Sequence, residues 1–182
     1  MQIVPATPGD ADEIDALLDS CFGAARHART AYRLRAGTLP IPALSLLARA
    51  ADGRLLGSIQ YWRLELVADG TGVAQPMTLL GPLAVLPEAR RGGVGGRLMA
   101  ASLALAQARG HDAVLLIGDA SYYGRFGFDA AATGGWRMPG PVEPERLLLR
   151  QTLPPRPMMR PLPRLAEVRA VRSTAAAVQG GP

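Results

Sequence analysis

Lysine is absent from this 182-residue chain, whose 20 basic side chains are all arginines. A nucleotide-binding loop of the G-x-x-x-x-G-K-[ST] type and a Schiff-base catalyst both require a lysine amine, so both are excluded. Cysteine occurs once, at Cys21. A lone cysteine cannot form a disulfide within the chain, which is typical of proteins in a reducing compartment. We therefore expect a cytoplasmic protein.

Long apolar runs and clusters of metal ligands are also missing. No run approaches the roughly 18 apolar residues that span a bilayer, and residues 1–15 lack the basic start and apolar core of a secretory signal. His27 and His111 stand outside any cluster of metal ligands. Ser121 lacks the G-x-S-x-G context of a serine nucleophile. We expect no metal and no membrane partner.

The overall composition is that of an ordinary globular domain. Hydrophobic residues make up 48% of the chain and charged residues 19%, and the length suits one domain with a full core. The net charge of +5 could reflect an anionic ligand or nucleic acid. A simpler interpretation is the arginine- and alanine-rich codon usage of a GC-rich genome.

Periodicity and turn signals predict a mixed α/β domain over residues 1–153. One helix should begin at residues 7–10 and end at Gly23, with Cys21 on its apolar, core-facing side. Asp52-Gly53 is a strong hairpin signal, and residues 67–76 should form a loop. Further strands are expected at 2–6, 44–51, 54–66, 77–85, 113–117, 127–132 and 147–153, and helices at 30–36, 94–109 and 121–125.

Residues 154–182 differ in composition, with many prolines and arginines and a single acid. They are predicted to form a Pro/Arg-rich C-terminal tail that is extended or partly disordered, with a short helix near residues 165–171. The tail arginines lack interleaved aromatic side chains, so nucleic-acid stacking is not expected. These arginines are Arg156, Arg160, Arg164, Arg169 and Arg172.

The segment 80–99 combines a buried strand, a loop and a glycine cluster that opens a helix. The unpaired N–H groups of a first helical turn and the helix dipole attract anions, and glycines let a phosphate approach the backbone. Arg90 and Arg91 add positive charge. A dinucleotide fold does not fit, because Leu98 stands where the third glycine of G-x-G-x-x-G belongs. The predicted anion-binding residues are Arg90, Arg91, Gly92, Gly93, Val94, Gly95 and Gly96.

Two motifs in this sequence resemble those of the GNAT superfamily of N-acetyltransferases. Arg90-x-x-Gly93-x-Gly95 resembles the Q/R-x-x-G-x-G/A motif that holds the pyrophosphate of acetyl-CoA. Residues 123–128, YGRFGF, resemble the family's Y-x-x-x-G-F, and the wider string YYGRFGF is similar to a bacterial branch of "predicted acetyltransferases". The resemblance covers about residues 2–150.

The resemblance implies a fold, a cosubstrate and roles for particular residues. The sheet should be mixed and mostly antiparallel, flanked by helices and splayed at the acyl-CoA site. The backbone of Leu83, Ala84 and Val85 should line the pantetheine of acetyl-CoA, and one N–H there should polarise the acetyl carbonyl. An amine attacks the thioester directly in a ternary complex, and Tyr123 protonates the leaving thiolate. Alternatively Tyr123 only packs over the sulfur; Tyr122 is expected in the core.

The acceptor and the general base stay open. Glu65, Glu88 and Asp119 lie near suitable strand ends, although Asp119 is equally suited to cap the short helix that follows it. By resemblance the acceptor, a small-molecule amine or a protein amine, should lie between residues 24–41 and the closing strands. The arginines of that segment indicate an acidic or carboxylate-bearing acceptor; they are Arg26, Arg29, Arg33 and Arg35.

Two other classes of function remain as alternatives: an acyl-CoA-binding module without turnover, and an RNA- or ribosome-associated protein that uses the arginine-rich tail. A free edge strand in this type of fold could also support a homodimer.

Overall fold

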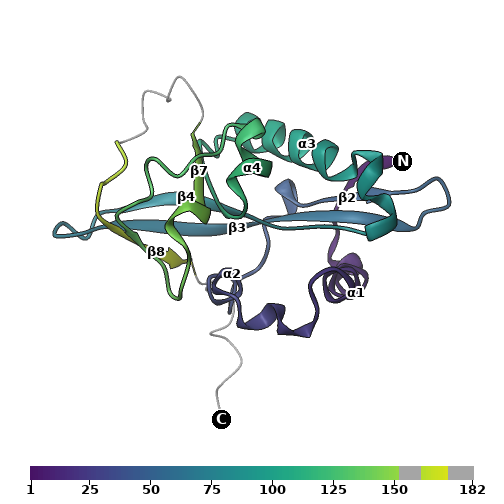
Figure 1. Ribbon diagram of the computed structural model, residues 1–182, viewed down its shortest axis with the longest axis horizontal. Coiled ribbons are helices and arrows are strands. Elements are labelled where there is room, and N and C mark those ends of the chain that lie inside the picture. Colours follow the sequence, from purple (N-terminus) through teal and green to yellow (C-terminus); the bar gives the residue numbers. More distant parts are fainter. Residues whose placement is uncertain (152–160, 172–182) are drawn as a thin grey trace, which may run out of the picture.

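A mixed eight-stranded sheet runs through the centre of the molecule, and helices lie on both of its faces (Figure 1). The computed structural model describes residues 1–151 and 161–171. Its strands are β1 (Gln2–Pro5), β2 (Leu46–Arg49), β3 (Leu55–Ala68), β4 (Ala74–Val85), β5 (Ala113–Ile117), β6 (Trp136–Arg137), β7 (Leu147–Gln151) and β8 (Ala166–Ala170). Its α-helices are α1 (Ala11–Phe22), α2 (Thr30–Arg33), α3 (Val94–Ala108) and α4 (Ala120–Tyr123).

Strand β3 organises the sheet, because it pairs with three other strands. Strand β4 runs antiparallel along one edge of β3, and the opposite edge is divided between β2 and β8. The main path of the sheet is β1-β2-β3-β4-β5-β7, with β4 and β5 parallel to each other. The short β6 runs parallel to β8. The predicted mixed, mostly antiparallel sheet with flanking helices is thus confirmed.

At the predicted helix start a 3₁₀ turn, Pro8–Asp10, leads into helix α1, which ends where the sequence predicts. The backbone N–H and the hydroxyl of Thr7 both donate to the Asp10 carboxylate at 2.7 Å, which fixes the first turn. Gly23 ends the helix with a φ of 72°, a conformation that favours glycine. The buried side of α1 packs on one face of the sheet through Ile14, Leu17 and Leu18. Helix α3 covers the opposite face (Figure 1).

Strands β4 and β5 separate soon after they meet. They pair only at Thr78–Val114 and Leu79–Leu115, although β4 continues to Val85 and β5 to Ile117. Backbone groups of β4 beyond residue 79 therefore have no strand partner on the β5 side, and each needs another partner or a ligand. Because α3 follows β4 and α4 follows β5 along the chain, the two helix starts stand near the opening of this split.

Two predicted elements differ from the structure. The loop at 67–76 is shorter than expected, since β3 extends to Ala68 and β4 starts at Ala74. Residues 127–132 form no strand: Asp129 makes one isolated bridge to Leu149, and its side chain accepts the N–H of Ala131 and turns the chain. The strand predicted at 147–153 is present as β7 as far as Gln151, and residues 152 and 153 lie outside the described residues.

The predicted helix near 165–171 is also wrong, because residues Ala166–Ala170 form strand β8. Ala166 and Val168 face the core while Arg169 faces solvent, which is the alternation of a strand. The proposed tail therefore contributes a strand to the sheet. Arg156, Arg160 and Arg172 lie outside the described residues. Within 1–151 and 161–171, no helix has the length and apolar character needed to cross a membrane.

Candidate active site

The glycine-rich loop leads directly into helix α3. Gly93 is the residue before the helix and has a φ of 70°, in the left-handed region that glycine adopts without strain. Gly95 and Gly96 occupy the first turn and add no side chains of their own there, and no acidic residue lies in that turn. Arg90 and Arg91 are exposed just before it. This helix start is positively charged and sterically open, as an anion site requires.

A cavity of about 770 Å³, here called the α3 groove, lies at this helix start. Most of the predicted anion- and pantetheine-binding residues line it: Leu83, Val85, Arg90, Arg91, Gly93, Gly95 and Gly96. Three predicted residues do not line it. The side chains of Ala84 and Val94 are buried in the core, and Gly92 is exposed beside the groove. Only the backbone of these three residues is available to a ligand.

Helix α4 brings two tyrosines to the groove. Asp119 caps this helix, since its carboxylate accepts the N–H of Ser121 at 2.9 Å. The rings of Tyr122 and Tyr123 meet edge to face, with centroids 4.8 Å apart. Tyr123 also packs against the buried Phe128. Burial is the main reason that the pKa of Tyr123 rises to about 12, so its hydroxyl keeps its proton near neutral pH.

The prediction that Tyr122 belongs to the core is wrong. Its ring is half-buried and lines the α3 groove, with its hydroxyl about 3.0 Å from where a Cβ on Gly95 would lie. The guanidinium of Arg125 lies 4.1 Å from the centre of that ring. Cys21, in the last turn of α1, packs against the core as predicted, and its Sγ contacts the Val85 carbonyl at 3.4 Å at the edge of the groove.

A second cavity, of about 650 Å³, lies next to the first and is called the α2 pocket. Its walls come from the α2 segment, from β4 and β5, and from the chain before β7. Four residues line both cavities: Phe22, Leu83, Asp119 and Tyr123. The two cavities therefore adjoin at Tyr123, beside the split between β4 and β5.

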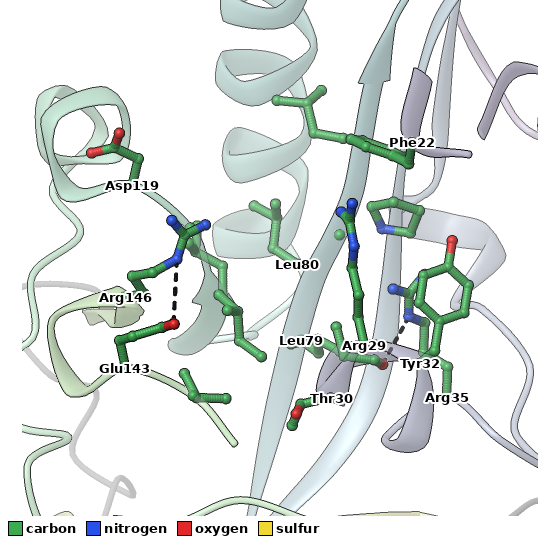
Figure 2. Close-up of a pocket in the computed structure, with 18 of the residues that line it drawn as sticks. Phe22, Arg29, Thr30, Tyr32, Arg35, Leu79, Leu80, Asp119, Glu143 and Arg146 are labelled. Carbon is green, nitrogen blue, oxygen red and sulfur yellow. Dashed lines mark hydrogen bonds and ion pairs between the residues drawn. The ribbon is translucent and has the colours of Figure 1, made fainter. Parts of the chain in front are cut away.

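Charged side chains stand on opposite walls of the α2 pocket. Figure 2 shows Arg146 and Glu143 on one wall and Arg29, Tyr32 and Arg35 on the other. Arg146 Nε lies 3.9 Å from the Glu143 carboxylate. The guanidinium of Arg35 stacks 3.8 Å from the Tyr32 ring centroid, and burial lowers the pKa of Arg35 to about 10. At neutral pH Arg35 is therefore still a cation.

The four predicted acceptor arginines separate into two groups. Arg29 and Arg35 line the α2 pocket, whereas Arg26 and Arg33 do not. Arg26 is 2% exposed and pairs with carboxylates of α1, at 2.7 and 3.0 Å, so it fastens this segment to the helix. Arg33 donates to the Pro139 carbonyl at 3.0 Å. Sequence patterns did not identify Arg146, because only the folded chain places it across the α2 pocket from the α2 segment.

The candidate bases and histidines occupy different places. Glu88 pairs with Arg54 at 3.1 Å on the surface, and Glu65 lies on β3 opposite Arg169 of β8, away from both cavities. Asp119 alone of the three predicted acids lines the site, and its hydrogen bonds to Ser121 lower its pKa. Neither His27 nor His111 lines either cavity. Among the described residues no group of histidines, cysteines and carboxylates could hold a metal ion.

Comparison with known proteins gives relatives along most of the chain. Residues 2–131 match the model of the Acetyltransferase (GNAT) domain. The chain is 34% identical over 152 residues to the uncharacterized N-acetyltransferase YjhQ of Escherichia coli strain K12, which covers 82% of each chain. It is 32% identical over 126 residues to the uncharacterized N-acetyltransferase YhbS of the same strain, covering 69% of this chain and 71% of YhbS.

Solved structures resemble the fold as well. The crystal structure of YhbS from Escherichia coli in complex with CoA superposes with a TM-score of 0.69 and 26% identity, covering 91% of this chain and 88% of that one. A GNAT family acetyltransferase from Brucella melitensis in complex with acetyl-CoA gives a TM-score of 0.57 and 29% identity, covering 81% and 93% of the two chains.

Proposed function

This chain belongs to the GNAT family of N-acetyltransferases, and we propose that it moves an acetyl group from acetyl-CoA to an amine by direct attack in a ternary complex. The observation that carries the proposal is the junction of two cavities at Tyr123. The α3 groove would hold acetyl-CoA and the α2 pocket the acceptor. The two substrates would then meet beside the β4–β5 split, so that transfer needs no covalent enzyme intermediate. We also propose a cytoplasmic location, on the basis of the single cysteine.

The α3 groove suits the pyrophosphate of acetyl-CoA. The open N–H groups of the first turn of α3 would donate to phosphate oxygens, and Arg90 and Arg91 would supply charge. Arg125, stacked on Tyr122 in the same groove, is a further cation within it. The YhbS and Brucella structures are complexes with CoA and acetyl-CoA, which supports acetyl-CoA as the ligand.

The split in the sheet suits the thioester. The N–H of Leu86 donates to the Leu56 carbonyl on β3, whereas the Val85 carbonyl turns away from β3 and accepts from Cys21 and Arg90. Alternate residues of a strand direct their backbone groups to opposite sides. Leu83, two residues before Val85, should therefore point its N–H into the split. We assign this N–H to the polarisation of the acetyl carbonyl.

Tyr123 is assigned as the proton donor. Attack by the neutral amine forms the C–N bond, and the C–S bond breaks to release CoA thiolate, which takes the phenol proton. The tyrosinate left behind regains a proton from solvent. The pKa of about 12 keeps Tyr123 protonated over the whole working range of pH. Asp119 is a poor base because it is already held by the N–H of Ser121. We therefore propose that solvent water, and not Asp119, takes the proton that the attacking amine loses.

Gly95→Asp is expected to weaken CoA binding at least tenfold, about 1.4 kcal/mol. A side chain at this position meets the Tyr122 hydroxyl at about 3.0 Å and puts a negative charge where phosphate should bind. Calorimetric titration with CoA measures the effect. Ala100→Asp is the matched control, since it adds the same charge on the exposed side of the same helix. Equal CoA affinity in folded Gly95→Asp and wild type would contradict the assignment of the phosphate site to this loop.

Gly118→Ala is expected to lower the transfer rate at saturating acetyl-CoA by tenfold or more. A Cβ on Gly118 would overlap the ring of Tyr123, so the ring must shift and carry its hydroxyl away from the thioester. Gly124→Ala makes the same change nearby, where a Cβ meets nothing within 4 Å, and should be nearly silent. Single-turnover rates of both variants test the position of Tyr123. A full rate for Gly118→Ala would argue against it.

A further inference from the structure

Two arginines in the segment between α1 and β2 are buried, and they differ in whether a carboxylate pairs with them. Arg26 is 2% exposed and has two carboxylate partners, Asp15 and Asp19. Arg35 is 8% exposed, and no described carboxylate contacts it. Its Nε donates to the Ala31 carbonyl at 3.0 Å, and its plane stacks on the Tyr32 ring. A buried cation is costly without an anion, so Arg35 is a cation that lacks its counter-charge.

The position of Arg35 shows where such an anion would bind. Its side chain lines the α2 pocket, so a ligand in that pocket can approach it. Arg29 lines the same wall, with its guanidinium 5.4 Å from the Phe22 ring and without a carboxylate among the described residues. Two guanidinium groups on one wall fit a carboxylate or phosphate.

The opposite wall differs in charge. Asp119 and Glu143 lie on that side together with Arg146, which is 3.9 Å from Glu143 (Figure 2). The pocket wall with Arg29 and Arg35 is therefore cationic. The other wall carries charges of both signs and holds both carboxylates of the pocket. A molecule with an amine and an acidic group would be oriented by this difference, with its amine toward Asp119 and Tyr123.

We infer that the acceptor is a small amine that also carries an anionic group, held by Arg35 and Arg29 in the α2 pocket. This inference rests on the proposed function, because it takes the α2 pocket as the acceptor site. A cavity of about 650 Å³ has ample room for an amine of amino-acid size. Carboxylate and phosphate are recognised by the same guanidinium chemistry, and the experiment separates them.

The experiment compares amines with and without an anionic group, with rates expressed per neutral amine: alanine with alaninamide, phenylalanine with phenylalaninamide, and phosphoethanolamine with ethanolamine. CoA release and direct binding in the presence of CoA are both measured for each amine. The anionic member of at least one pair should have a kcat/KM at least tenfold above its neutral partner. The carboxylate and phosphate pairs show which anion is preferred. Arg35→Gln should reduce the ratio of kcat/KM between the anionic and the neutral amine by about 10–100-fold, through a higher KM for the anionic amine, as expected for a lost charge-assisted hydrogen bond.

Variants separate recognition from folding and from chemistry. Arg29→Gln changes an exposed side chain, should fold normally, and should also reduce the preference. Arg109→Gln, an exposed change at the far end of α3, should leave it intact. Equal transfer to both members of every pair, or equal binding of both, would overturn the inference while transfer itself upholds the proposed function. Binding of the anionic amines that depends on Arg35 but is followed by no transfer would support an anion site at Arg35 and contradict the proposed function.

Discussion

Tyr123→Phe is expected to slow acetyl transfer by roughly 10²-fold or more at saturating acetyl-CoA. The substitution keeps the ring and its packing against Phe128 but removes the assigned proton donor. CoA affinity should change little, because the assigned phosphate site at Arg90–Gly96 is untouched. The loss should stand near the lower end of the range for acid catalysis, since a thiolate with a pKa near 8.5 leaves tolerably without a proton. Single-turnover measurements isolate the chemical step.

The pH dependence and a neighbouring variant sharpen this prediction. A phenol pKa raised to about 12 leaves the acid form dominant at every lower pH, so the wild-type rate should rise as the amine deprotonates, with no falling limb below about pH 10. Tyr122→Phe removes the other phenol at the groove and should affect CoA affinity rather than the chemical step. If Tyr123→Phe keeps the full rate while chemistry limits turnover, Tyr123 only packs over the sulfur.

A chain shortened to residues 1–153 is expected to melt at least about 10 °C below the full chain. The shortening removes β8, which pairs with five residues of β3 and buries Ala166 and Val168. The indole of Trp136 also loses its bond to the Pro163 carbonyl. Burial of Val168 alone contributes about 1.5–3 kcal/mol, a large part of the 5–15 kcal/mol that holds a typical domain together. Each kcal/mol is worth about 2–4 °C at this size.

Point substitutions separate β8 from the rest of the removed segment. Val168→Ser should cost about 2 kcal/mol, because it deletes buried methyl groups and buries a hydroxyl. Arg169→Ser, one residue further along and facing solvent, should cost much less. Thermal unfolding of the three variants beside wild type gives the comparison. A shortened chain that melts with the full chain would mean that β8 adds no stability and that the boundary at residue 153 is sound.

Elements with strong local signals could be predicted from the sequence. Thr7 precedes the 3₁₀ turn that leads into α1, Gly23 ends that helix, and the limits of β5, Ala113–Ile117, are those of a continuous apolar run. The cluster at Gly93–Gly96 placed the start of α3 correctly for the same reason. Each of these signals lies within a few residues of the feature that it specifies, so no knowledge of distant contacts is needed.

Features that depend on distant contacts were missed. Strand β8 is short and follows several prolines, and its pairing with β3 is what makes it a strand. Tyr122 is expected in the core from the sequence, yet its ring lines the α3 groove, because the turn of α4 directs it there. The α2 pocket joins Arg35 to Arg146, which lie far apart in the chain, so composition could suggest an anionic acceptor but could not identify the arginines that face it.

The central claim is direct transfer from acetyl-CoA to an amine in a ternary complex. Initial rates of CoA release, measured while both substrates are varied, test it most directly when the mass of the acceptor is followed in parallel. We predict intersecting reciprocal plots, one acetyl group gained by the acceptor for each CoA released, and no acetyl group on the protein. Parallel plots with acetylated protein, or tight binding of acetyl-CoA without an acetylated amine anywhere in the panel, would contradict the claim.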